Sequence, residues 1–382
     1  MKYMKVKDLF KIIKGKKVEQ VYETNENTVR LIQIDDLRND DNIKYCERKE
    51  EYIFANKNDV IIAWDGANAG TIGYGLEGAI GSTLAILRTD SNNIFIPYIG
   101  RFLQSKSKYL RDTCTGATIP HISKKALEEI KIPIPSYEKQ IEISKILDKA
   151  QELIDKRKAQ IEALDQLTQS VFLEMFGDPR LNKKNWKKQK LNDVCLRKGE
   201  YGSGSSAIPY DSGKPRYIRI TDIRDDGSLN DDIVAPSNPD DYEKYRLNEG
   251  DILFARSGAT VGKTYLHSEK NGYCIFAGYL IRFVPDTSKI NPKFLFHFTR
   301  TQYYKQWVMN KQNTVAQPNI NAKQYGEELF IICPPLELQN RFTKIVEEIE
   351  AEKELLQKSM VELQNNFNSL MQRAFKGELF ND

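Results

Sequence analysis

The sequence predicts an α+β protein in which two tandem domains, built of mixed strands and short helices, are each followed by a long helix. Two observations predict this architecture. One is an internal repeat whose offset is close to half of the 382 residues, and the other is a pair of helical segments with heptad spacing. We expect the domains at 1–135 and 178–334. The long helices are expected at 136–177 and 335–382, the latter with a C-terminal tail.

Four segments of the chain occur twice, in the same order. Their offset rises gradually from 186 to 199 residues. The pairs are 31–38 with 217–224, 59–70 with 251–262, 119–123 with 317–321, and 134–140 with 333–339. One such match could arise by chance, but four in order indicate a duplication.

Both copies follow one plan. Short apolar runs such as 60–63 and 252–255, bounded by Gly, Asn and Asp turns, predict strands. Pro135 and Pro334 then stand just before the helical segments, where proline is tolerated and blocks continuation from upstream. Each copy therefore reads as a strand-rich domain that ends in a helix.

Apolar residues recur four and three residues apart along both helical segments, which is the spacing of a coiled-coil seam. The first seam consists of Ile143, Leu147, Ala150, Ile154, Arg157, Ile161, Leu164, Thr168, Val171 and Met175. The second consists of Phe342, Val346, Ile349, Lys353, Leu356, Met360, Leu363, Phe367, Leu370 and Ala374. So narrow a seam suits a partner helix, and the alternative is that each helix packs on its own domain.

Polar interruptions of the seams indicate which helices pair. At a constant offset of 199, Lys353 of the second seam aligns with Ile154 of the first. Likewise, Arg157 of the first aligns with Leu356 of the second. Such mismatches favour pairing of the two unlike helices over self-pairing. Because the connecting loops are short, we expect an antiparallel coiled coil with internal pseudo-twofold symmetry.

Composition excludes several classes of protein. Lys plus Arg number 57 and Asp plus Glu 53, so the net charge of +4 is far from that of a histone-like protein, although a basic face remains possible. No run approaches the ~20 apolar residues of a membrane span, and no apolar run follows the N-terminal lysines as in a signal peptide. Five scattered cysteines without a CxxC pair predict a reducing compartment, and we expect the protein in the cytoplasm. Three distant histidines make a His-based metal centre improbable.

One segment, 257–264, comes close to a phosphate-binding loop. Its first position is Ser257 instead of glycine, and the equivalent segment 65–71 has no lysine. We therefore expect a glycine turn between strands, or a loop that presents Arg256, Lys263 or Thr264 to DNA, and keep a nucleotide hydrolase as the alternative.

The segment 333–336 lacks both the polar amide and the aromatic residue of the adenine-methyltransferase motif. The chain is therefore not expected to be a methyltransferase. We expect no catalytic residue and no metal ligand on it.

Loops rich in Asn, Gln, Thr, Lys and Arg are the candidates for DNA contact, because amides can bond adenine edges and cations can bind guanine or phosphate. In the first copy the candidates are Gln33, Trp64, Asn68, Thr71, Thr118, His121, Ser123 and Lys124. In the second copy they are Arg219, Thr221, Arg256, Thr260, Lys263, Gln317, Asn319, Asn321 and Lys323. The basic run 183–190 could add phosphate contacts. The alternative for each residue is a solvated loop whose polar groups cap local turns.

Taken together, these features resemble the DNA-specificity (S) subunits of type I restriction-modification systems. The resemblance covers essentially the whole chain. It rests on the tandem repeat, the segment Gly-Asp-Ile-Leu-Phe-Ala-Arg-Ser-Gly-Ala-Thr-Val-Gly-Lys at 250–263, the Pro-Pro-Leu-Glu-Leu-Gln segment at 334–339, and Glu-Met-Phe-Gly-Asp at 174–178.

The resemblance implies a non-catalytic subunit with two target-recognition domains, each reading one half of a bipartite, asymmetric target in double-stranded DNA. The paired helices would fix the spacing and dock two methyltransferase subunits. Those partners would bind S-adenosylmethionine and methylate adenine, so no cofactor is expected on this chain. A translocase-nuclease subunit is an optional further partner.

Two alternatives stay open. One is the specificity subunit of a related system with a combined methyltransferase-nuclease partner, and the other is a coiled-coil adaptor without DNA contact. The first copy carries Trp64 and Asp65 where the second has Arg256 and Ser257, so DNA contacts are not carried from one copy to the other.

Overall fold

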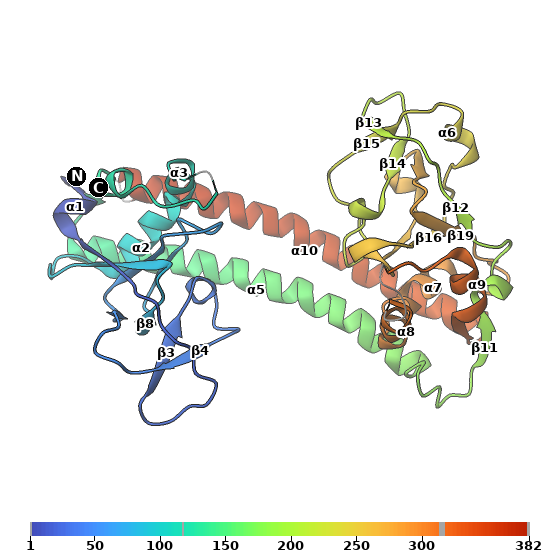
Figure 1. Cartoon of the computed structure of the whole chain (residues 1–382). Coiled ribbons are helices and arrows are strands. Elements are labelled where there is room, and N and C mark those ends of the chain that lie inside the picture. The colour runs from blue at the N-terminus through green and yellow to red at the C-terminus, as the bar shows by residue number, and fades with distance from the viewer. Residues whose placement is uncertain (1, 117, 313–317, 380–382) are drawn as a thin grey trace. The chain divides into compact units, whose positions relative to one another are not determined.

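The structure, a computed structural model, describes residues 2–116, 118–312 and 318–379. Two compact units divide the chain: unit 1 is Met1–Lys158 with Lys358–Asp382, and unit 2 is Ala159–Gln357. The division falls inside both long helices, α5 (Tyr137–Phe176) and α10 (Leu336–Lys376) (Figure 1). Each unit therefore combines one strand-rich domain with a part of each helix, and the unit boundaries differ from the predicted domain boundaries along the chain.

Unit 1 is organised around two four-stranded sheets, ordered β2-β9-β6-β7 and β4-β3-β8-β5, with β1 and β10 as a separate antiparallel pair. The strands are β1 (Lys2–Lys5), β2 (Lys11–Lys14), β3 (Thr28–Ile32), β4 (Lys44–Glu47), β5 (Phe54–Ala55), β6 (Val60–Ala63), β7 (Ile72–Tyr74), β8 (Gly78–Ile80), β9 (Leu84–Arg88) and β10 (Lys131–Ile134). The short helices are α1 (Val6–Leu9), η1 (Asp35–Leu37), α2 (Ile96–Ser105), α3 (Ser107–Asp112) and α4 (Lys124–Glu128).

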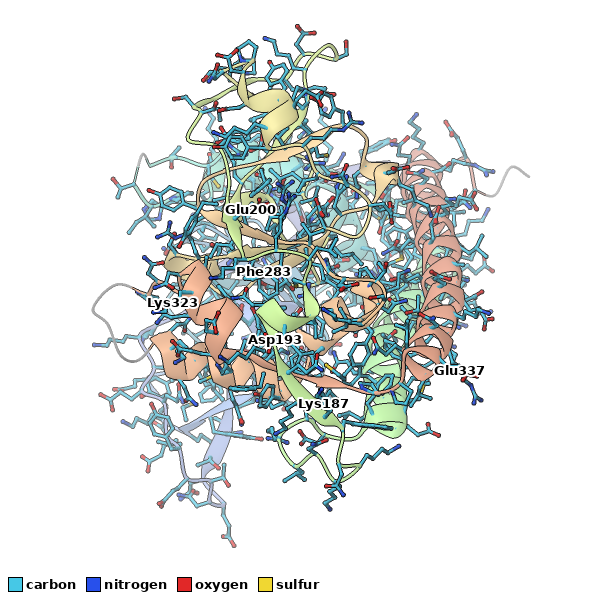
Figure 2. The ribbon with its side chains drawn as sticks, turned by 90° about the vertical axis from the view of Figure 1, so that its right-hand side faces the viewer. Lys187, Asp193, Glu200, Phe283, Lys323 and Glu337 are labelled. Atoms are coloured by element: carbon cyan, nitrogen blue, oxygen red, sulfur yellow. The ribbon has the colours of Figure 1, made fainter. Side chains whose placement is uncertain are left out.

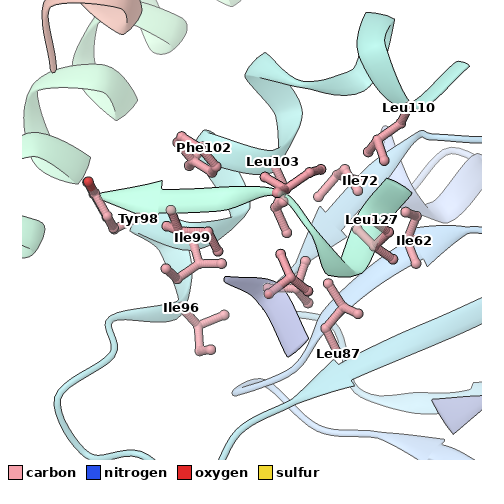
Figure 3. Close-up of a cluster of buried hydrophobic side chains, with 14 of the residues drawn as sticks. Ile62, Ile72, Leu87, Ile96, Tyr98, Ile99, Phe102, Leu103, Leu110 and Leu127 are labelled. Carbon is pink, nitrogen blue, oxygen red and sulfur yellow. The ribbon is translucent and has the colours of Figure 1, made fainter. Parts of the chain in front are cut away.

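The core of unit 1 explains the apolar run at β6. Val60 and Ile62 face a cluster shared with α2 and α5, whereas Ile61 and Ala63 face a second cluster on the other side of the sheet. Both faces are covered, so all four residues are buried and the strand reads as continuously apolar. Figure 3 shows part of the first cluster, where Ile62 and Leu87 lie near Ile99 and Leu103 of α2.

Unit 2 repeats this plan with a four-stranded sheet ordered β12-β19-β16-β17, the antiparallel pair β11–β20, the parallel pair β14–β18 and the antiparallel pair β13–β15. The strands are β11 (Lys187–Lys190), β12 (Glu200–Tyr201), β13 (Ala207–Pro209), β14 (Arg216–Ile218), β15 (Val234–Pro236), β16 (Ile252–Ala255), β17 (Thr264–Leu266), β18 (Cys274–Phe276), β19 (Leu280–Phe283) and β20 (Phe330–Cys333). The helices are η2 (Leu191–Val194), η3 (Ile220–Asp222), α6 (Asp241–Lys244), η4 (Gly258–Thr260), η5 (Glu269–Asn271), α7 (Pro292–Phe298), α8 (Gln302–Gln312) and α9 (Ala322–Glu328).

Equivalent backbone hydrogen bonds show that the sequence repeat is a repeat of structure. The Gly70 amide donates to the Ala63 carbonyl over 2.8 Å, and the Gly262 amide donates to the Ala255 carbonyl over 3.0 Å. The two glycines have φ of 88° and 87°, which other residues rarely adopt. The same turn thus follows β6 in unit 1 and β16 in unit 2.

The long helices pair as the seams predict. None of the twenty seam residues is exposed: each is buried or half-buried. In unit 2 the Phe342 ring of α10 lies 5.3 Å from that of Phe176 on α5, and Lys353 Nζ lies 2.6 Å from an Asp165 carboxylate oxygen. Positions rise along α10 as they fall along α5, so this pairing is antiparallel.

The helices also complete the domain cores. Each seam therefore packs against the partner helix and against the domains. The core of unit 1 joins Ile143 and Leu147 of α5 to Phe367 and Ala374 of α10. In unit 2, Phe176 of α5 packs against Phe294 of α7 with ring centroids 4.8 Å apart. Each domain therefore buries the long helix of the other copy in its core.

A buried glutamine locks the start of each long helix to its domain. Gln140 Nε2 donates to the Pro135 carbonyl over 3.1 Å, and its Oε1 accepts from the Phe95 amide over 2.9 Å. Gln339 makes the equivalent bonds to the Pro334 carbonyl and the Asn291 amide, each over 2.8 Å. Because both side chains are fully buried, each helix has one allowed direction as it leaves its domain.

The basic run after α5 closes the end of that helix. Gly177, with φ of 77°, donates its amide to the Leu173 carbonyl over 2.8 Å. Lys184 Nζ donates to the carbonyls of Glu174 and Met175 over 2.8 and 2.9 Å, and Trp186 Nε1 donates to that of Phe176 over 2.8 Å. Lys184 is therefore a helix cap.

We predict that Phe342→Ala lowers the free energy of unfolding by about 3–5 kcal/mol, because it removes a fully buried ring between the two long helices. Leu355→Ala on the same helix is the matched control, since that side chain is 60% exposed and its loss should change stability by less than about 0.5 kcal/mol. Urea denaturation measures both. Equal effects for the two variants would contradict the pairing.

Candidate nucleic-acid interface

Each unit carries a hollow at the same position of the repeat. In unit 1 its lining includes Lys17, Gln33, Asn68 and Thr83. In unit 2 it includes Ser205, Arg219, Thr221 and Tyr279. The two hollows contain four of the residues that the sequence proposes for DNA contact.

The backbone establishes that the hollows are equivalent. The Trp64 amide donates to the Thr83 carbonyl over 2.7 Å, and the Arg256 amide donates to the Tyr279 carbonyl over 3.0 Å. The same backbone hydrogen bond therefore fixes one wall of each hollow, and this backbone arrangement is called the frame below.

A buried aspartate supports the wall of each hollow. Asp36 accepts from the Gln33 amide over 2.7 Å, and Asp222 accepts from the Arg219 amide over 2.8 Å. Both carboxylates are buried, which makes these bonds costly to lose. The frame is thus constant between the copies, while the side chain it presents changes from an amide to a guanidinium.

The guanidinium of Arg219 is largely engaged within the protein. Its Nη2 lies 2.7 Å from carboxylate oxygens of both Asp222 and Asp232, and its Nε donates to Asp222 over 3.1 Å. The pKa of Arg219 is raised above its usual value, chiefly by the side-chain hydrogen bonds to Asp222. Burial lowers this pKa, and the hydrogen bond to Asp232 raises it further. This leaves Nη1 as the nitrogen best able to meet a DNA acceptor.

The amide candidates of unit 1 keep their donors available. Gln33 Oε1 accepts from Lys44 Nζ over 2.8 Å, and Asn68 Oδ1 accepts from Arg38 Nη2 over 2.7 Å. Because the oxygens are occupied, the NH₂ groups of Gln33 and Asn68 are left to donate to acceptors on base edges. Thr71 instead donates its hydroxyl to the Asn68 carbonyl over 2.9 Å and stabilises the turn.

Trp64 and His121 are held beside this hollow by internal contacts. The Trp64 ring is only 7% exposed, and the Lys14 ammonium lies 5.6 Å from its centroid. His121 Nδ1 lies 2.6 Å from an Asp65 carboxylate oxygen, and Lys14 lies 3.3 Å from the other. The Trp64 ring therefore packs against Lys14, and of the two candidates only the His121 imidazole is exposed.

In unit 2, Arg256 gathers several candidates into one cluster. Its guanidinium lies 4.7 Å from the Tyr201 ring centroid, and its Nε donates to Asn319 Oδ1 over 3.4 Å. The Tyr201 hydroxyl accepts from the Ala322 amide at the start of α9 over 3.1 Å. Figure 2 shows Lys323 on the same helix, where it is exposed.

The remaining candidates mostly make local contacts. Asn321 caps α9 by accepting from the Gln324 amide over 2.9 Å, and Ser123 caps α4 by accepting from the Ala126 amide over 3.3 Å. Thr260 donates to the Ser257 carbonyl over 3.2 Å.

Three candidates stand apart from these caps. Lys124 pairs loosely with Glu128 at 3.6 Å, and Thr118 is exposed. Gln317 lies outside the described residues.

The segment 257–264 is a hairpin turn and does not form a phosphate-binding loop. It joins β16 to β17, which pair antiparallel, and no helix follows it. Thr264 is fully buried, with its hydroxyl 2.7 Å from that of Thr299. Lys263 Nζ is taken by the Ile223 carbonyl at 3.2 Å and by Asp225 at 2.8 Å. The nucleotide-hydrolase alternative was therefore wrong, because the local topology is strand-turn-strand.

Sequence reasoning missed several residues of the hollows. Lys17, Thr83, Ser205 and Tyr279 line them, and Tyr279 is 62% exposed. Extending the repeat to 81–83 and 277–279 would have found Thr83 and Tyr279. Lys17 belongs to a short basic run at 14–17 that has no counterpart in the second copy.

Among the described residues, no group of three or more His, Cys, Asp or Glu side chains is placed to hold a metal ion. No described helix has a stretch long and apolar enough to cross a bilayer.

The repeat, the paired helices and the two hollows define a two-domain recognition protein, and comparison with known proteins agrees. Residues 1–164 and 183–365 match the family described as the type I restriction modification DNA specificity domain, so the chain belongs to this family. It is a DNA sequence-specificity subunit and is not itself an enzyme. Subunits of this type bind DNA and assemble with modification and restriction subunits.

Two curated relatives span most of the chain. The specificity subunit of type I restriction enzyme MjaVIII from Methanocaldococcus jannaschii is 27% identical over 98% of this chain and 92% of its own length. The EcoBI specificity subunit from Escherichia coli is 22% identical over 94% and 81%.

Two solved structures share the fold. The S subunit of a type I system from M. genitalium aligns with a TM-score of 0.57 at 17% identity, over 98% of this chain and 96% of that one. A chain from a structural study of the assembly and conformational transition of the type I system aligns with a TM-score of 0.58 at 17% identity, over 99% and 98%.

We predict that Asp222→Ala destabilises the protein by about 3 kcal/mol, since it strips the partly buried Arg219 of its main partner and leaves the Arg219 amide without an acceptor. Asp231→Ala is the control, because that carboxylate is 99% exposed and pairs with the surface residue Arg224. Thermal or urea unfolding would measure the difference. A loss no larger than that of the control would mean that Asp222 does not support the hollow.

Proposed function

We propose that each domain reads one half of a bipartite, asymmetric DNA target through its hollow. The observation that carries this is the pair of equivalent frames with different side chains. Asp36 and Asp222 hold the same backbone, yet Gln33 stands where the second copy has Arg219. Two readers of one shape and different chemistry suit a target whose halves differ.

The chemistry of the two surfaces supports different preferences. Unit 1 offers the free NH₂ groups of Gln33 and Asn68, which can donate to acceptors on base edges. Unit 2 offers Arg256, whose planar guanidinium can bind guanine bidentately and lies 4.7 Å from the centroid of the exposed Tyr201 ring. Unit 1 is therefore the amide-based reader and unit 2 the guanidinium-based reader.

We propose further that the helix pair fixes the distance between the half-sites and docks two methyltransferase subunits. Exposed aliphatic side chains on the long helices of each unit support docking: Leu153 and Val361 in unit 1, and Leu167, Leu173 and Leu355 in unit 2. S-adenosylmethionine and adenine-N6 chemistry would reside on those partners. A translocase-nuclease subunit would join for restriction, and the complex would act in the cytoplasm.

Exchanging residues 1–135 for the first domain of another family member should change one half of the methylated sequence and leave the other half intact. Methylome sequencing of cells carrying the exchanged subunit with its partner, against cells carrying the original and cells carrying neither, measures this. If both halves changed, the modular assignment would be wrong. If the original subunit directed no methylation, the proposed function would be wrong.

Removing one heptad from each long helix should shorten the unmethylated spacer by roughly three base pairs. Seven helical residues span about 10.5 Å, and ten base pairs span about 34 Å. Deleting 155–161 with 357–363 keeps the phase of both seams, and a deletion of four residues from each helix, which breaks the phase, is the control. A spacer of unchanged length in a folded, active complex would refute this role of the helices.

A further inference from the structure

A strongly cationic hollow lies in unit 1, bounded by the α2–α3 connection, the β1–β10 pair and the last turns of α10. Its described lining contains no Asp or Glu. It contains five cations, namely Lys106, Lys108, Arg111, Lys131 and Lys376. Within the described part of the chain, none of the five forms an ion pair. So many uncompensated like charges repel one another and favour an anionic ligand.

The fold does not require this charge, because unit 2 builds the same hollow differently. Ser105 Oγ donates to the Phe102 carbonyl over 2.5 Å, and in unit 2 Thr301 Oγ1 donates to the Phe298 carbonyl over 2.7 Å. Phe375 in the last turn of α10 packs against Tyr98 of α2, as Phe176 at the end of α5 packs against Phe294 of α7.

Of the three lysine and arginine side chains in the unit 2 hollow, Arg180 and Arg300 are used internally and Lys305 is exposed. Arg180 pairs with Asp178 at 2.6 Å. Arg300 donates to the carbonyls of Asp225 and Thr264 over 2.7 and 2.9 Å. Unit 2 therefore keeps its architecture with one exposed lysine, Lys305, at this place, and the five cations of unit 1 call for a functional explanation.

The rest of the lining suits phosphate oxygens. Between the cations lie Ser107, Asn368 and Gln372, which can donate hydrogen bonds. Gln104 Nε2 donates one hydrogen to the Ile72 carbonyl over 3.2 Å and keeps a second. Lysine and arginine interleaved with small uncharged donors are the usual partners of the nucleic-acid backbone. An acidic protein helix would satisfy the charge alone and would make little use of these short side chains.

The hollow adjoins the turn that carries one of the candidate base contacts. α3 packs on the turn after β6: a Cβ placed at Gly70 would lie 3.3 Å from Leu110 and 3.4 Å from Arg111. Asn68 belongs to that turn, and Thr118 and His121 come after α3 in the sequence. One duplex could therefore meet both the hollow and the loop.

We propose that this hollow holds the phosphate backbone of the DNA next to the half-site read by unit 1. The inference rests on the proposed function, since it assumes that unit 1 meets DNA. It assigns unit 1 a larger share of the salt-sensitive affinity than unit 2. The bases are read by the hollow around Gln33 and Asn68, so binding of the phosphate backbone here is independent of the DNA sequence.

The test is a triple variant, Lys106→Gln, Lys108→Gln and Lys131→Gln, in the full subunit assembled with its methyltransferase partner. Affinity for target and non-target duplexes should fall together, and the slope of log K against log salt should become shallower by about 3, at ~0.9 per phosphate contact. Single Lys108→Gln should give about a third of the change. Arg180→Gln with Lys305→Gln and Lys344→Gln removes the same charge from unit 2 and should leave the slope nearly unchanged.

Two results would overturn the inference. One is an unchanged salt slope in a triple variant that melts at the wild-type temperature. The other is loss of assembly with the methyltransferase on gel filtration, which would identify an acidic protein partner. These differ from failure of the proposed function, in which the wild-type complex itself would show no preference for any DNA sequence.

Discussion

The antiparallel packing of α5 against α10 is the constraint on which the rest of the structure depends. Phe176 of the first helix lies in the core of unit 2, and Ala374 of the second lies in the core of unit 1. Neither strand-rich domain closes its core without the helix of the other copy. The helices are thus a structural part of both domains, and each domain is fixed to the pair through a buried glutamine, Gln140 or Gln339.

This arrangement separates two tasks within each copy. Buried groups such as Asp36 and Asp222 hold the peptide frame of the hollow and are the same in both copies. The side chains presented by that frame, Gln33 or Arg219, are half-buried and differ between the copies. The two copies thus share one backbone frame and present different chemistry from it.

The sequence predicted the helices and the repeat well because both depend on local periodicity. The helix expected at 136–177 is observed at Tyr137–Phe176, and the apolar runs at 60–63 and 252–255 are strands. Lys353, which interrupts the second seam, was expected to disfavour self-pairing, and it forms an ion pair with Asp165. The sequence pattern could not reveal that partner, because the partner lies 188 positions away.

The recognition surface was only partly predictable, since polarity in a loop does not show where a side chain is used. Lys263 was proposed for DNA but is bound to the Ile223 carbonyl and Asp225, and Trp64 is buried beneath Lys14. Tyr279 was missed because a lone tyrosine next to glycine carries no pattern until the frame around it is known. These outcomes depend on tertiary contacts that no local rule contains.

The position of the first strand and the last helix has a consequence for the order of the chain. Tyr3 of β1 and Phe375 of α10 line one hollow in unit 1, so both ends of the described chain belong to the same compact unit. Joining these two ends would give a circular chain, in which the two copies follow one another through two equivalent junctions. The other junction is the turn at 181–185, and a chain opened there and joined across the ends of the described chain would keep both domain cores and the helix pair. Which domain comes first in the chain is therefore independent of the fold.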